Sequence, residues 1–163
     1  MYIQSNLFEM ALRIKEPLYI KNISFNEEVG ELHIYIDFRR GSKFSCPVCN
    51  QEHCAVHDTV EKVWRHLNFF QYKCYIHFRN PKIRCDKCGV RQLVTYWARP
   101  QSGFTSLFEA FILTLAREMP VSQIAELVGE HDTQIWRILH FHISKAYAAK
   151  DFYKLTHIGI DET

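Results

Sequence analysis

The sequence predicts an α+β protein with an N-terminal β-hairpin, a zinc-ribbon-like β module and a three-helix C-terminal domain. Three observations predict this class. The runs 19–25 and 32–38 are strand-like, and in the second run Leu32, Ile34, Ile36 and Phe38 share one face. Two Cys-x-x-Cys pairs follow, and from residue 104 apolar residues recur at helical spacing. The 163 residues suffice for one ordinary domain or for two or three small modules.

The composition is that of a folded chain. Hydrophobic residues make up 47% and charged residues 23%, which excludes wholesale disorder and fibrous classes. No apolar run approaches the ~18 residues of a membrane span, and the N-terminus lacks the pattern of a secretory signal. We therefore expect a cytoplasmic protein without a membrane partner. In that reducing compartment, cysteines serve more often as metal ligands or buried thiols than in disulfides.

The first segment, residues 1–38, should contain a short helix and a β-hairpin. Apolar residues between positions 4 and 14 follow helical spacing until Pro17 interrupts it. The strand-like runs at 19–25 and 32–38 are joined by a short turn that ends in Gly30.

The second segment, residues 39–99, should be a β module that binds zinc. Cys46, Cys49, Cys85 and Cys88 form two knuckles, which together supply the four thiolates of a closed structural zinc site. The 35 residues between the pairs exceed the ~15–20 of compact ribbons, so a hairpin formed by 60–67 and 71–78 must bring the pairs together.

Alternatives to this ligand set remain open. Cys54, His53 or His57 could replace one ligand or support the site from outside. The four cysteines could also be buried thiols or a redox pair. Cys74 alternates with Tyr72 and Ile76 in a strand pattern, so we expect it in the core.

The middle of the chain is basic. Residues 60–99 hold nine Lys and Arg against two Asp and Glu, while both flanking parts are acidic. Such a module suits double-stranded DNA, because cations pair with phosphates, although a solvated basic face would give the same count. Arg99, in an extended Ala-Arg-Pro segment, could enter a minor groove. The cations that we assign to DNA are Lys62, Arg65, Lys73, Arg79, Lys82, Arg84, Arg91 and Arg99.

The third segment, residues 100–150, should hold three helices after a linker at 98–103. The first helix is expected over 104–118, the second over 122–128 with Gly129 at its end, and the third over 133–149 with Asp132 as N-cap. The apolar faces expected to be buried comprise Leu107, Phe108, Phe111, Leu115 and Ala116 in the first helix and Ile135, Leu139 and Ile143 in the third.

This order of helix, tight turn and longer helix is that of a helix-turn-helix. In that motif the start of the last helix enters the major groove, where Thr133, Gln134 and Arg137 would read bases and Lys145 would lie further along. An ordinary three-helix bundle is the alternative.

Five segments of the chain resemble the ISL-three group of bacterial insertion-sequence transposases. They are 38–49, 82–90, 97–105, 115–121 and the final Ile-Gly-Ile-Asp-Glu-Thr. The resemblance implies a zinc-binding domain, a helix-turn-helix and an RNase H-like catalytic domain, in that order. It also implies sequence-specific binding to the terminal inverted repeats of an insertion sequence.

Residues 151–163 would then be the first strand of the catalytic domain, with Asp161 as the first acid of its DDE triad. Two-metal phosphodiester cleavage needs further carboxylates to hold Mg²⁺ or Mn²⁺. Because the sequence ends two residues later, we expect this chain to be inactive. The alternatives are an active transposase whose chain continues beyond Thr163, and a zinc-stabilised interaction module that forms a homodimer.

Overall fold

The computed structural model describes residues 2–149, with side chains described from residue 6 onward. It comprises two units, of which the first ends at Glu109 and the second begins at Ala110. The expected strand at 151–163, including Asp161, lies outside the described residues. Within the part that is described, no helix is long and apolar enough to cross a membrane.

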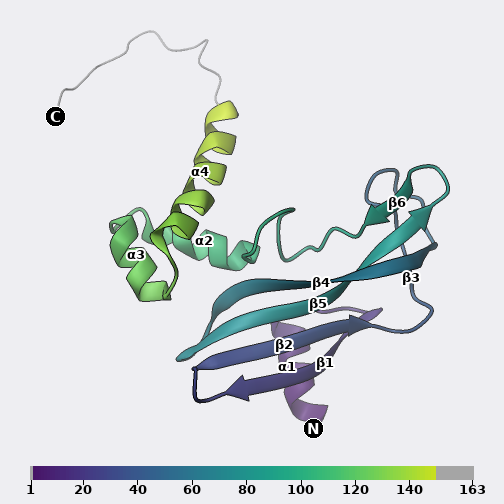
Figure 1. Cartoon of the computed structure of the whole chain (residues 1–163), viewed down its shortest axis with the longest axis horizontal. Coiled ribbons are helices and arrows are strands. Elements are labelled where there is room, and N and C mark those ends of the chain that lie inside the picture. Colours follow the sequence, from purple (N-terminus) through teal and green to yellow (C-terminus); the bar gives the residue numbers. More distant parts are fainter. Residues whose placement is uncertain (1, 150–163) are drawn as a thin grey trace. The chain divides into compact units, whose positions relative to one another are not determined.

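The first unit is built on a six-stranded sheet (Figure 1). Its central order is β1-β2-β5-β4-β3, and β6 also pairs with β5. Both predicted hairpins are confirmed, but the second extends well beyond the expected limits. The strands are β1 (Leu18–Asn26), β2 (Glu31–Phe38), β3 (Lys43–Phe44), β4 (Cys54–Phe69), β5 (Tyr72–Cys85) and β6 (Gly89–Gln92).

The two hairpins share one core because β2 and β5 pair in parallel. Leu32 lies opposite Cys74, and Ile34 lies opposite Ile76, all with less than 3% of their surface exposed. Helix α1 (Tyr2–Ala11) lies behind the sheet in Figure 1, and Phe8 packs against this core. The boundary drawn at residue 38 therefore does not separate two structural units. Cys74 is in the core, as predicted.

The segment at 98–103 is not the free linker that the sequence suggests. Gly103 accepts a hydrogen bond from the backbone N–H of Arg65, and Arg65 accepts one from Thr105. These bonds attach the segment to the edge of the sheet at β4. Pro100 and Gly103 keep this connection irregular, but it is held by hydrogen bonds. The first unit continues to Glu109.

Three helices follow in the expected order: α2 (Ser106–Leu115), α3 (Val121–Val128) and α4 (Asp132–Ala148). Gly129 ends α3 in the left-handed conformation, as predicted, with φ of 68°. The N-cap prediction for α4 is wrong, because His131 holds that position in an extended conformation. Asp132 is the first helical residue, and its carboxylate accepts a bond from the N–H of Thr133.

The buried faces of these helices differ in part from the expected ones. In α2, Phe108 and Ile112 are buried, whereas Leu107 and Phe111 are exposed. In α4, Ile135 and Leu139 are buried as predicted, but Ile143 is 57% exposed. Both helices are apolar around much of their circumference, so the sequence pattern alone does not select the buried side.

Candidate metal centre and nucleic-acid interface

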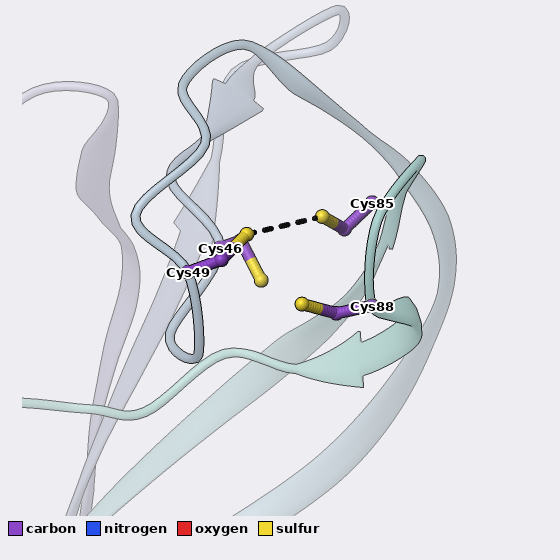
Figure 2. Close-up of side chains that lie close together, drawn as sticks. All are labelled: Cys46, Cys49, Cys85 and Cys88. Atoms are coloured by element: carbon purple, nitrogen blue, oxygen red, sulfur yellow. Dashed lines mark hydrogen bonds between the residues drawn. The ribbon is translucent and has the colours of Figure 1, made fainter.

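Four cysteine thiols converge at one end of the sheet (Figure 2). Cys46 and Cys49 come from the loop between β3 and β4, while Cys85 and Cys88 come from the end of β5 and the turn into β6. All four sulfur atoms lie within 4.8 Å of one another, and the Sγ atoms of Cys49 and Cys85 are 3.5 Å apart. A tetrahedral Zn²⁺ with Zn–S bonds of ~2.3 Å spaces its sulfurs about 3.8 Å apart, so the group fits such an ion.

Backbone hydrogen bonds prepare the first cysteine of each pair to be a thiolate. The N–H groups of Cys49 and Val48 lower the pKa of Cys46 to about 6. Burial opposes ionisation of Cys85, but the N–H groups of Cys88 and Lys87 outweigh it and lower the pKa of that thiol. The two pairs thus use the same arrangement, in which amides two and three residues later point at the first sulfur.

The thiol of Cys88 shows that the cluster needs a bound cation before all four cysteines can ionise. Its hydrogen bond with Cys49, followed by burial, raises the pKa of Cys88 to about 12. Four thiolates cannot lie this close together without a cation between them. A divalent metal supplies that charge, and thiolate is the ligand that zinc accepts in closed structural sites.

Local backbone geometry builds the two turns. The N–H of Cys46 donates to the carbonyl of Gln51, and the N–H of Asn50 donates to the carbonyl of Cys46, which closes the first turn. Gly89 follows the second pair with φ of 73°, a conformation that favours glycine. The side chain of Gln51, which the sequence analysis did not single out, lies 3.4 Å from Cys85 Sγ.

The alternative ligands lie outside the cluster. Cys54 is buried beside it, and its thiol donates to the carbonyl of Gln51. Burial raises the pKa of this thiol, as suits a neutral side chain. His53 and His57 are exposed, and His57 pairs with Arg84. Among the residues that the structure describes, only the four cysteines form a group able to share a metal ion.

In the second unit, the start of α4 presents the side chains expected to read DNA. Thr133 and Arg137 are one turn apart, and both are exposed, as is Lys145 near the end of the helix. Gln134 is half-buried. The opposite side of α4 carries the buried Ile135 and other apolar side chains, so the helix has one packed face and one polar face open to a ligand.

The basic side chains of the first unit do not form one patch. Alternation along β4 and β5 and the register between them put Lys62, Lys82 and Arg84 on one face of the sheet. The other face carries Arg65, Lys73, Arg79 and, through its pairing with Ile83 in β5, Arg91. A DNA backbone that follows one face would therefore meet only part of the set.

Three of these arginines bond to internal groups, while Lys82 and Arg84 pair with exposed side chains. Arg65 is 3% exposed, and its guanidinium donates to the backbone carbonyls of His66 and Cys74, so it is not placed to bind phosphate. Arg99 donates from Nε to the buried carboxylate of Glu109 at 3.0 Å. Arg79 donates twice to the carboxylate of Asp37 but keeps 44% of its side chain exposed. The sequence shows the charges but not these internal partners.

Two families match parts of the chain. Residues 42–88 match the zinc-finger of transposase IS204/IS1001/IS1096/IS1165, and residues 94–143 match the helix-turn-helix domain of transposase family ISL3. Together the two matches cover more than half of the chain, in the order that the structure shows. No curated protein and no solved structure matches it.

Proposed function

We propose that this chain, which belongs to the ISL3 family of transposases, recognises the terminal inverted repeats of its insertion sequence through α4. The family assignment makes it a DNA-binding part of a transposase. The observation that carries the finer proposal is the turn at Gly129, followed by a helix whose first turns expose Thr133 and Arg137. A helix presented in this way enters the major groove with its N-terminal residues against the bases.

The two units make different contacts with DNA, the second with bases and the first with phosphates. Arg137 has the planar fork that suits guanine O6 and N7, so it specifies sequence. Arg84, on the face of the sheet that also carries Lys62 and Lys82, pairs with phosphates and adds affinity without selecting bases. Because Arg65 is buried, it is left out of this set.

The test compares Arg137→Ala with Arg117→Ala, a control that removes an exposed arginine outside α4. Binding to a terminal-repeat duplex and to a scrambled duplex is measured across a salt series. Arg137→Ala should weaken only the repeat, by roughly 1–3 kcal/mol. Arg84→Ala should weaken both duplexes alike and reduce the salt slope by about one, whereas Lys73→Ala, on the opposite face of the sheet, should leave the salt slope unchanged. Equal weakening of both duplexes by Arg137→Ala would show that α4 does not read bases.

We also propose that Cys46, Cys49, Cys85 and Cys88 hold one structural zinc ion. The converging thiols and the backbone N–H groups aimed at Cys46 and Cys85 support this ligand set. Zinc bound by four thiolates has no open position for a substrate, so it stabilises the fold rather than reacting. Mg²⁺ or Mn²⁺ would belong to the catalytic domain of the family.

Metal analysis of the purified chain should find one zinc per molecule, and Cys85→Ala should abolish it. Structural zinc contributes on the order of 10 kcal/mol to folding, so chelation should unfold the knuckles and the strands beside them. A zinc-free chain with an unchanged melting curve would contradict the assignment.

A second candidate function is homodimer formation through α4. Trp136, Ile143 and Tyr147 recur at positions i, i+7 and i+11, and each is 47–63% exposed. At 3.6 residues per turn, this stripe lies roughly 80° around the helix from Thr133 and Arg137, so it can pack against a second copy beside the DNA-reading side. Ultracentrifugation should show a dimer that Ile143→Glu dissociates and Ser144→Glu does not. A wild-type monomer at high concentration would exclude this candidate.

A further inference from the structure

A small cavity lies on the face of the sheet that also carries Lys62, Lys82 and Arg84. Its volume is about 240 Å³, and its walls come from β4, β5, β6 and the segment up to Ser102. This is smaller than the ~300–1,000 Å³ typical of sites for drug-sized ligands. The space therefore suits one flat ring system rather than a whole cofactor.

Two side-chain amides in its wall have unsatisfied polar atoms. Asn80 is 2% exposed, and its Oδ1 atom has no hydrogen-bond partner among the residues that the structure describes. The same holds in the described part of the chain for Nε2 of Gln92. A buried polar atom without a partner costs about 1–3 kcal/mol, which indicates that a ligand completes the site.

The polarity of the missing ligand follows from how Asn80 is held. Its Nδ2 donates to the carbonyl of Leu93 at 3.1 Å, so Oδ1 must be the acceptor. The N–H of Leu93 in turn donates to Pro81, which fixes the segment against β5. The wall also carries the cations Lys62 and Arg99, but at Oδ1 of Asn80 the ligand must present a hydrogen-bond donor, which a phosphate oxygen cannot. Gln92 Nε2 requires an acceptor on the same ligand.

We infer that this cavity receives one unpaired DNA base. The Watson–Crick edge of a base places a donor beside an acceptor, and this edge is available only when the base has left the duplex. Trp64 lines the cavity but is 4% exposed, so only a small part of its ring meets the base. Lys62 in the wall, with Lys82 and Arg84 on the same face, supplies cations for the flanking phosphates. The inference rests on the proposed DNA-binding function and deepens it.

The experiment compares three duplexes with the full, zinc-loaded chain: one fully paired, one with a single bulged nucleotide, and one in which the bulge is abasic. The base bulge should bind roughly tenfold or more tightly than the abasic bulge. Gln92→Leu should abolish this difference and leave binding of the paired duplex unchanged. Gln71→Leu, at the exposed turn between β4 and β5, is the matched control and should keep the difference.

The outcomes separate the two proposals. If all three duplexes bind but the two bulges bind equally, the base pocket is wrong and the DNA-binding function stands. If no duplex binds, the DNA-binding function fails. An NMR titration with a single-stranded trinucleotide then tests separately whether the cavity binds a base. Shifts of the Asn80 and Gln92 side-chain amide signals with the trinucleotide, but not with its abasic form or inorganic phosphate, support it. Unchanged amide signals mean that only water fills the cavity and overturn the inference.

Discussion

Protonation of His66 should destabilise the first unit as the pH falls below neutrality. His66 lies in β4, and its Nδ1 atom is 2.8 Å from the hydroxyl of Thr105. Burial, assisted by the positive charge of Arg65, lowers the pKa of His66 from 6.5 to about 4. In the unfolded chain the imidazole titrates near 6.5, so between these values the unfolded state binds more protons than the folded state.

The sign and size of the effect follow from this difference. The contribution to stability is complete above pH 6.5 and is lost as the pH falls toward 4. Each tenfold change in proton affinity is worth about 1.4 kcal/mol, so the total loss is about 3 kcal/mol, of which about 2 kcal/mol falls between pH 7 and pH 5. Both figures are upper values, because the ring is partly exposed.

Urea denaturation at pH 7 and pH 5 measures this loss, with His66→Asn as the comparison. Asparagine places an amide near the position of Nδ1 but does not titrate. Acid also protonates the zinc ligands, but this occurs in both proteins and cancels in the difference between them. The free energy of unfolding of the wild type should fall by about 2 kcal/mol more than that of the variant. Equal losses in both proteins would refute the assignment of a neutral, buried imidazole.

Three further predictions test the fold and the metal centre by thermal or urea denaturation and metal analysis. Ile112→Ala should lower the free energy of unfolding by about 2–5 kcal/mol because it creates a cavity, whereas Leu107→Ala, on the exposed side of α2, should lower it by under about 0.5 kcal/mol. The reverse order would mean that the face containing Leu107, as expected from the sequence, is the buried one. Gly89→Ala should cost about 1–2 kcal/mol because its φ is 73°, while Gly103→Ala, whose φ is not in the left-handed region, should cost less. Cys54→Ala should keep one zinc per chain, and loss of the metal would make Cys54 a ligand.

Features set by local sequence were predictable. The knuckles at Cys46 and Cys85 follow from spacing, because a Cys-x-x-Cys turn itself directs two sulfurs to one centre. Gly129 ends α3 for an equally local reason, since a left-handed C-cap favours glycine. Both hairpins appear as short strand-like runs rich in apolar, aromatic and β-branched residues. In each case a few neighbouring residues determine the outcome, so no knowledge of the rest of the fold is needed.

Features that depend on distant partners were not predictable. The parallel pairing of β2 with β5 joins segments about forty residues apart, and nothing in either strand indicates it. The buried face of α2 depends on what packs against it, so the apolar Leu107 and the apolar Ile112 look alike in the sequence. The N-cap at His131 shows that a favourable residue such as Asp132 can occupy the first helical turn instead.

Charge shows the same division between local and distant causes. The excess of Lys and Arg in the middle of the chain correctly marked a module of a DNA-binding protein, because composition is independent of the fold. Which cations remain available depends on their partners: Arg65 is enclosed by backbone carbonyls, and Arg99 neutralises the buried Glu109. Removing Arg99 would leave that carboxylate buried without its cation, at a cost of several kcal/mol. The count of basic residues therefore overstates the number of cations that one DNA backbone could contact, and the register of β4 and β5, which divides the remaining cations between two faces, reduces that number further.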